Sequence, residues 1–123
     1  VVEQAAAALR VAPERAEALE QSLHHECDKG LGPAFSHGED FHSTLASLTD
    51  NNALRLVHAV TMRLGWQFFA QLADVDPRVS AISQRAKIEP AHRGIVDALT
   101  AGDAELAVMR MRAHVTATSA PDD

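Results

Sequence analysis

The chain has 123 residues, a length that fits a single domain. No apolar run approaches the ~20 residues that a membrane span needs, and the single cysteine, Cys27, excludes an internal disulfide framework. The net charge of −6, from 11 basic and 17 acidic residues, argues against direct binding of nucleic acid, which requires a basic face. No signal peptide is visible either, so we expect a cytoplasmic protein.

The pattern of residues is typical of an all-α protein, because tyrosine is absent and β-branched residues never alternate over the length of a strand. Pro13 and Pro90 suit the first positions of helices, and Gly102 followed by Asp103 is typical of a helix end and a new cap. Residues 49–52 predict a break whose side chains, Asn51 among them, can cap the helix that follows. In chain order, the expected helices are residues 1–10, 13–28, 34–48, 52–72, 90–102 and 103–116, with 78–88 either a loop or a short helix. Short connections between them predict an antiparallel bundle of six or seven helices.

Histidine is unusually frequent, with seven in the chain. His42, His92 and His114 belong to three different predicted helices, and each lies on or beside the apolar face of its helix. One inward histidine is usually a core residue satisfied by a hydrogen bond. Three that converge bring six ring nitrogens that need partners, and one divalent metal can bind three of them while keeping an open position. Spacing alone leaves both interpretations open.

Two stretches of the sequence carry a resemblance to a known family. Phe41 and His42 form a pair, and Asn51 stands nine residues after His42. The helix containing His92 leads through Gly102 and Asp103 to His114, which stands 22 residues after His92. This pattern resembles the FCD domain, the C-terminal effector-binding domain of GntR-type bacterial transcription regulators. The resemblance spans nearly the whole chain.

The resemblance implies a fold and a function. FCD domains are helical bundles, and many bind a divalent metal such as zinc, nickel, manganese or iron through three histidines and an aspartate. The metal histidines implied here are His42, His92 and His114. In the family a small carboxylate metabolite commonly occupies the pocket at the metal, and its binding adjusts the DNA-binding heads of a homodimer. Some members lack the metal and bind acyl chains, so the resemblance also leaves a metal-free pocket open. DNA is contacted only through an N-terminal winged-helix domain, which is absent from this chain, and no membrane partner is expected.

One position departs from the family pattern. The family's aspartate lies four residues before the first histidine, where this chain has Gly38. Glu39 and His37 are the candidates for a fourth metal ligand, and an anion or a water that completes the shell is the alternative. His58 and Thr61, near the inner face of the long helix, are candidates for contacting the effector; each is equally well interpreted as a boundary residue with a solvated tip.

Three functions are compatible with these residues. The interpretation that we favour is a sensing domain that is not an enzyme. A helical metalloenzyme would use the same histidines to activate water at an open metal position. A metal-free structural dimerisation module would use them as polar core residues.

Overall fold

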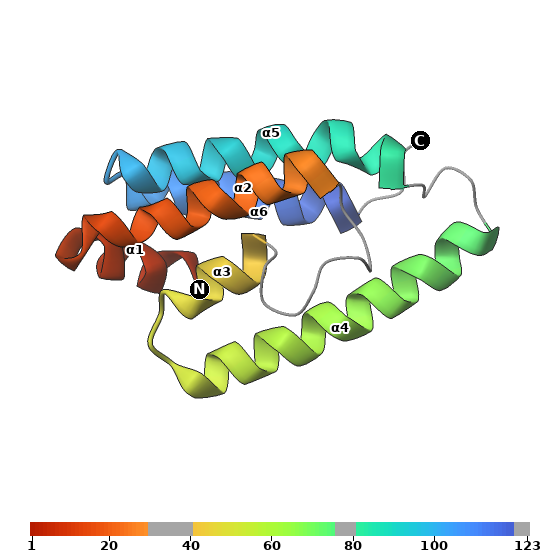
Figure 1. Ribbon diagram of the computed structural model, residues 1–123, viewed down its shortest axis with the longest axis horizontal. Coiled ribbons are helices and arrows are strands. Elements are labelled where there is room, and N and C mark those ends of the chain that lie inside the picture. The colour runs from red at the N-terminus through yellow and green to blue at the C-terminus, as the bar shows by residue number, and fades with distance from the viewer. Residues whose placement is uncertain (30–40, 76–80, 120–123) are drawn as a thin grey trace.

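The structure, a computed structural model, describes residues 1–29, 41–75 and 81–119. Over these ranges the chain forms six α-helices and one short 3-10 turn, and no strand (Figure 1). The elements are α1 (Val2–Val11), the 3-10 turn (Pro13–Arg15), α2 (Ala16–Lys29), α3 (Phe41–Ser47), α4 (Asn52–Val75), α5 (Ala81–Thr100) and α6 (Ala104–Ser119). The prediction of an all-α protein is therefore confirmed.

Three helices run alongside one another and form the centre of the fold. α5 packs against both α2 and α6, and Figure 1 shows that α5 runs antiparallel to each of them. α1 packs on α6, and α3 packs against α2 on one side and α4 on the other. The long helix α4 therefore lies along the outside of the bundle, next to the short helix α3 (Figure 1).

Several helix ends form as the sequence predicts. The Oδ1 atom of Asn51 accepts a hydrogen bond from the backbone N–H of Leu54 at 3.0 Å, which caps the start of α4. Asp103 caps α6 in the same way, with its Oδ1 accepting from the N–H of Leu106 at 3.0 Å. Between α5 and α6, Gly102 has a φ of 77°, a left-handed conformation that glycine adopts without strain.

The predicted start of the fifth helix is wrong. Pro90 does not open α5 but lies inside it, because the helix begins at Ala81. A proline within a helix removes one backbone hydrogen bond, at a cost of roughly 3 kcal/mol. The packing of α5 against α2 and α6 offsets that cost, and sequence patterns contain no signal of such packing. α4 also continues to Val75, three residues beyond the predicted end. Residues 34–40 of the predicted helix 34–48, and residues 78–80 of the predicted loop or short helix 78–88, lie outside the described residues.

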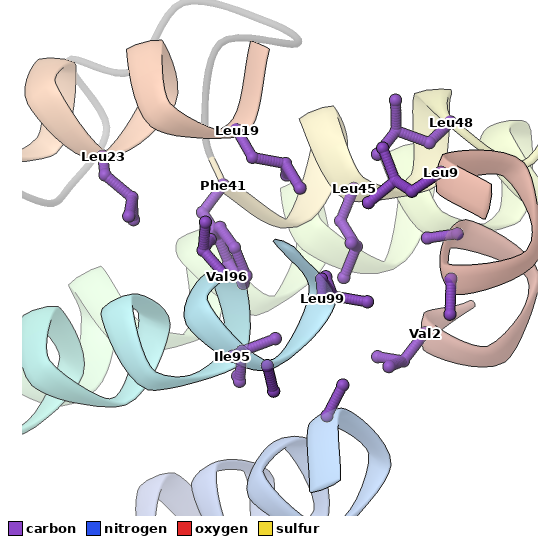
Figure 2. Packing of buried hydrophobic residues seen from close by; sticks show 14 residues of the cluster. Val2, Leu9, Leu19, Leu23, Phe41, Leu45, Leu48, Ile95, Val96 and Leu99 are labelled. Atoms are coloured by element: carbon purple, nitrogen blue, oxygen red, sulfur yellow. The ribbon is translucent and has the colours of Figure 1, made fainter. Parts of the chain in front are cut away.

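The apolar core lies where α1, α2, α3, α5 and α6 meet (Figure 2). Phe41, the first residue of α3, is fully buried, and its ring points between α2 and α5 in Figure 2. The larger buried side chains around it are Leu19, Leu23, Leu45, Ile95, Val96 and Leu99.

Among the described helices, none combines the length and the apolar character that a bilayer-crossing segment needs.

An ion pair joins α2 and α5 at the surface. The guanidinium group of Arg93 donates two hydrogen bonds to the carboxylate of Glu20, at 2.9 and 2.6 Å, and a third to Asp97 at 3.3 Å. The hydrogen bonds from Arg93 lower the pKa of Glu20 against the opposing effect of burial. Because both side chains are more than a third exposed, solvent screening keeps the contribution of the pair small.

We expect Glu20→Gln to lower the free energy of unfolding by about 0.2–1 kcal/mol at neutral pH. Since folding lowers the pKa of Glu20, this contribution is present above the unfolded value of 4.5 and is lost as the pH falls through the folded value. Urea unfolding from pH 7 downwards should therefore show the two proteins converging below about pH 4.5. Glu17→Gln, an equal charge change on the same helix, is the control, and a gap that stayed constant with pH would contradict the ion pair.

Candidate metal centre

The structure brings His42, His92 and His114 together, although they come from α3, α5 and α6. Each offers a ring nitrogen, and these atoms all lie within 4.8 Å of one another. His92 and His114 are 2% and 7% exposed, and His42 is half-buried. The convergence that the sequence left open is thus present in the fold.

The antiparallel pair of α5 and α6 explains why two of these histidines meet. Asp103, at the turn between the helices, stands midway between His92 and His114 in the sequence. Residues at equal distances from the turn of an antiparallel pair lie side by side. His42 joins them from the first turn of α3, next to the buried Phe41.

Two of the three rings are nearly parallel, and the third stands across them. The rings of His42 and His114 are nearly parallel, at 9° and 5.5 Å between centroids. The ring of His92 stands almost perpendicular to both, at 87° to His42 and 82° to His114. The Nε2 atoms of His92 and His114 are 3.0 Å apart, close enough for one N–H to donate a hydrogen bond to the other nitrogen.

The electrostatic surroundings keep one of these ligands neutral. Burial, and to a lesser extent the nearby His92, lower the pKa of His114 to about 4, although Glu26 acts in the opposite direction. A histidine binds a metal only in its neutral form, so His114 is in the correct state at physiological pH without having to lose a proton.

The donor set fits a divalent transition metal. In a tetrahedral zinc site, ligand nitrogens at 2.0–2.1 Å from the metal lie roughly 3.3 Å from one another, a spacing close to that of His92 and His114. Imidazole nitrogens suit zinc, nickel and iron, whereas magnesium and calcium prefer oxygen ligands. His42, His92 and His114 would hold the ion, which would act as a Lewis acid at its remaining positions.

A pocket of about 420 Å³ opens beside the cluster, and this volume is that of a small-molecule site. His42 belongs both to the histidine cluster and to the wall of the pocket. The other lining residues are Val1, Val2, Glu3, Leu45, His58, Val108, Met111 and Arg112. The pocket therefore adjoins the cluster and is bounded by α1, α3, α4 and α6.

The remaining predicted residues are placed differently. His58 is half-buried in the pocket wall, with its ring 6.2 Å from that of His42. Thr61 is exposed and does not line the pocket, and its hydroxyl donates a hydrogen bond to the carbonyl of Val57 at 2.8 Å. The candidate fourth ligands, His37 and Glu39, and Gly38 between them lie outside the described residues.

Two residues of the site were missed by sequence reasoning. Glu26 on α2 is 1% exposed, and its carboxylate lies against His92. A signal for it was present, because Glu26 follows Leu19 and Leu23 at the spacing of one helix face and is thus a carboxylate on an apolar face. Arg112 in the pocket wall stands two residues before His114 and had no comparable signal.

The described helices hold a three-histidine cluster beside a pocket, an arrangement that suits the binding of a small ligand. A family model for the FCD domain matches residues 2–117. The chain therefore belongs to the FCD family, whose members are the C-terminal, regulatory domains of GntR-family regulators. The comparisons returned no matching curated protein and no matching solved structure.

We expect His92→Ala and His114→Ala to abolish stoichiometric metal binding while the protein still folds, because each removes one of three ligands and leaves most of the apolar core intact. Elemental analysis of the purified proteins measures the metal, and circular dichroism measures the helices. His24→Ala, at an exposed position on α2, is the control and should retain the metal. A variant at position 92 or 114 that kept one equivalent of metal would show that the site is wrongly assigned.

Proposed function

We propose that this chain is the effector-sensing domain of a GntR-type transcriptional regulator, and that it binds a small carboxylate metabolite at a divalent transition metal held by His42, His92 and His114. The observation that carries the proposal is the shared position of His42, which belongs to the cluster and also lines the pocket. An ion bound by three neutral imidazoles keeps its full positive charge and an open coordination position. A carboxylate oxygen can fill that position and offset the charge.

Among the described residues, the pocket wall contains one carboxylate side chain, that of Glu3, and one cationic side chain, that of Arg112, and the cation supports an anionic ligand. Arg112 lines the pocket on α6, and a guanidinium group binds a carboxylate through two parallel hydrogen bonds. His58 adds a second polar ring beside His42. The apolar lining residues Leu45, Val108 and Met111 favour a ligand with a short hydrocarbon part. In the full-length regulator, which we place in the bacterial cytoplasm, DNA would be bound by another domain.

Thermal shift measurements with a panel of small mono- and dicarboxylates test this function. The metal-loaded protein should be stabilised by at least one of them, by about 2.7 kcal/mol at a concentration one hundred times the dissociation constant. Chelation with EDTA should abolish the effect. We expect Arg112→Gln to weaken binding of the same carboxylate about tenfold, the loss of roughly one charge-assisted contact.

Arg10→Gln, an equal charge change at an exposed site outside the pocket, is the control and should bind as the wild-type protein does. Stabilisation by the carboxylate in the presence of EDTA would overturn the role of the metal. A carboxylate dissociation constant that is unchanged in Arg112→Gln would overturn the role of Arg112. Metal-dependent turnover of the carboxylate, followed by NMR, would contradict a purely sensing function and favour a metalloenzyme.

We also propose that the domain acts as a homodimer, and that α4 contributes the contact. Apolar side chains at helical spacing remain exposed along this helix: Val57, Val60, Leu64, Phe68 and Val75. Leu64 is 60% exposed and Phe68 65%. Large exposed apolar stripes are uncommon on monomers, and a stripe on one helix is self-complementary about a twofold axis.

Leu64→Glu should therefore weaken self-association, because two copies of the added carboxylate would face each other in an apolar contact. Sedimentation equilibrium measures the effect as at least a tenfold rise in the dimer dissociation constant. Ala59→Glu, at an exposed position about 140° around the helix, is the matched control and should leave the dimer intact. A protein that is monomeric at every concentration would overturn the proposed dimer.

A further inference from the structure

A buried carboxylate lies directly beside the histidine cluster. Glu26, on α2, has a side chain that is only 2% exposed, and both of its carboxylate oxygens contact the Nδ1 atom of His92, at 3.1 and 2.9 Å. A buried carboxylate is costly unless its charge is compensated by a partner of opposite polarity. Its position therefore calls for a specific role in the cluster.

The contact determines how His92 presents its two nitrogens. An ionised carboxylate can only accept hydrogen bonds, so Nδ1 of His92 is the atom that carries the proton and donates it to Glu26. The neutral ring then has its lone pair on Nε2. This is the nitrogen that lies 3.0 Å from Nε2 of His114, inside the cluster. Glu26 thus selects the tautomer in which His92 offers Nε2 to an ion.

The orientation of the His92 ring is fixed on its face as well as on its edge. The ring of Phe41 stacks on that of His92, with centroids 4.2 Å apart and planes inclined by 23°. Phe41 is fully buried, which leaves the stacked pair little freedom. Rotation of the imidazole is therefore opposed by Phe41 on its face and by Glu26 at Nδ1.

We propose that Glu26 is the positioning residue of the metal centre: it holds His92 in the Nδ1–H form, with Nε2 directed at the metal, and supplies a negative charge outside the ligand set. The inference rests on the proposed metal site. Glu26 acts through His92 and is not itself a ligand, because both of its oxygens lie at Nδ1, on the side of the ring away from Nε2. A carboxylate bound to a ligating histidine raises the basicity of that ligand and strengthens metal binding.

The fold provides a matched comparison for this residue. Glu20 lies on the same helix and contacts Arg93, the neighbour of His92 on α5. The two carboxylates therefore join the same pair of helices, one at the surface and one in the interior. Only Glu26 touches the histidine cluster. A variant at position 20 removes an α2–α5 contact without altering the proposed site.

The experiment compares zinc and nickel affinities of the wild-type chain with those of Glu26→Gln, Glu26→Leu and Glu20→Gln, measured by competition with a chelator. Glu26→Gln removes the charge and keeps an acceptor, while Glu26→Leu removes both. We expect the dissociation constant to rise about 10–100-fold in Glu26→Gln, further in Glu26→Leu, and less than twofold in Glu20→Gln. Glu26→Asp, which restores the charge on a shorter side chain, should recover part of the loss.

A second readout separates positioning from a merely structural role. Nitrogen-15 NMR of the histidine rings in the metal-free proteins reports which nitrogen carries the proton. His92 should be in the Nδ1–H form in the wild-type chain and shift towards Nε2–H in Glu26→Leu. If Glu26 had a structural role alone, its replacement would change urea unfolding of the metal-free protein. The tautomer of His92 would stay the same, and so would the metal affinity once the lost stability is allowed for.

The outcomes distinguish this inference from the metal site on which it rests. If the wild-type chain binds neither zinc nor nickel, the proposed metal centre is overturned, and so is the proposed role of Glu26. If the wild-type chain binds metal and Glu26→Gln binds it equally well, the site stands and only the role of Glu26 is overturned. A wild-type His92 in the Nε2–H form would also overturn that role.

Discussion

The need to satisfy polar ring atoms inside an apolar core governs this fold. His92 is buried and its ring stacks on that of the fully buried Phe41. Glu26 from α2 and His114 from α6 meet the two nitrogens of the His92 ring from opposite sides. The contacts extend across three helices, so the relative positions of α2, α5 and α6 are tied to the hydrogen bonding of one imidazole. A buried donor or acceptor left without a partner costs about 1–3 kcal/mol, which penalises any other arrangement.

The polar cluster and the apolar core reinforce each other. Phe41 packs with Leu19, Leu45 and Val96 (Figure 2) and also stacks on His92, so the same side chain completes the core and orients the imidazole. Outside this region, the ion pair between Glu20 and Arg93 joins α2 to α5 at the surface. The three described histidines of the site are held by regular helices, as a preorganised binding site requires.

α3 connects the histidine cluster to the outer part of the domain. It is a short helix of seven residues that packs between α2 and α4, and it carries His42. The pocket is bounded partly by α3 and partly by α4, which contributes His58. A ligand that binds at His42 would thus contact the element that packs against α4. In the function that we propose, the effect of ligand binding reaches the exposed apolar stripe of α4 through the packing of α3 against α4.

Much of the secondary structure followed from local signals in the sequence. The caps Asn51 and Asp103 and the left-handed Gly102 formed as predicted, because they depend on atoms within a few residues. Pro90 is the exception, since its place inside α5 depends on packing against distant helices rather than on its neighbours. The spacing of His92 and His114 about a turn also made their meeting predictable once the two helices were known.

The sequence by itself determined that the chain is helical, where most helices end, and which three histidines lie on inward faces. Only the tertiary structure decided that His42 reaches the other two, that Glu26 lies against His92, and that Arg112 and His58 share a pocket. The physical reason is that helix formation and capping act within one or two turns, whereas these contacts join residues from separate helices. The angle and register at which the helices pack fix such contacts, and they depend on the combined shapes of all the side chains in the core.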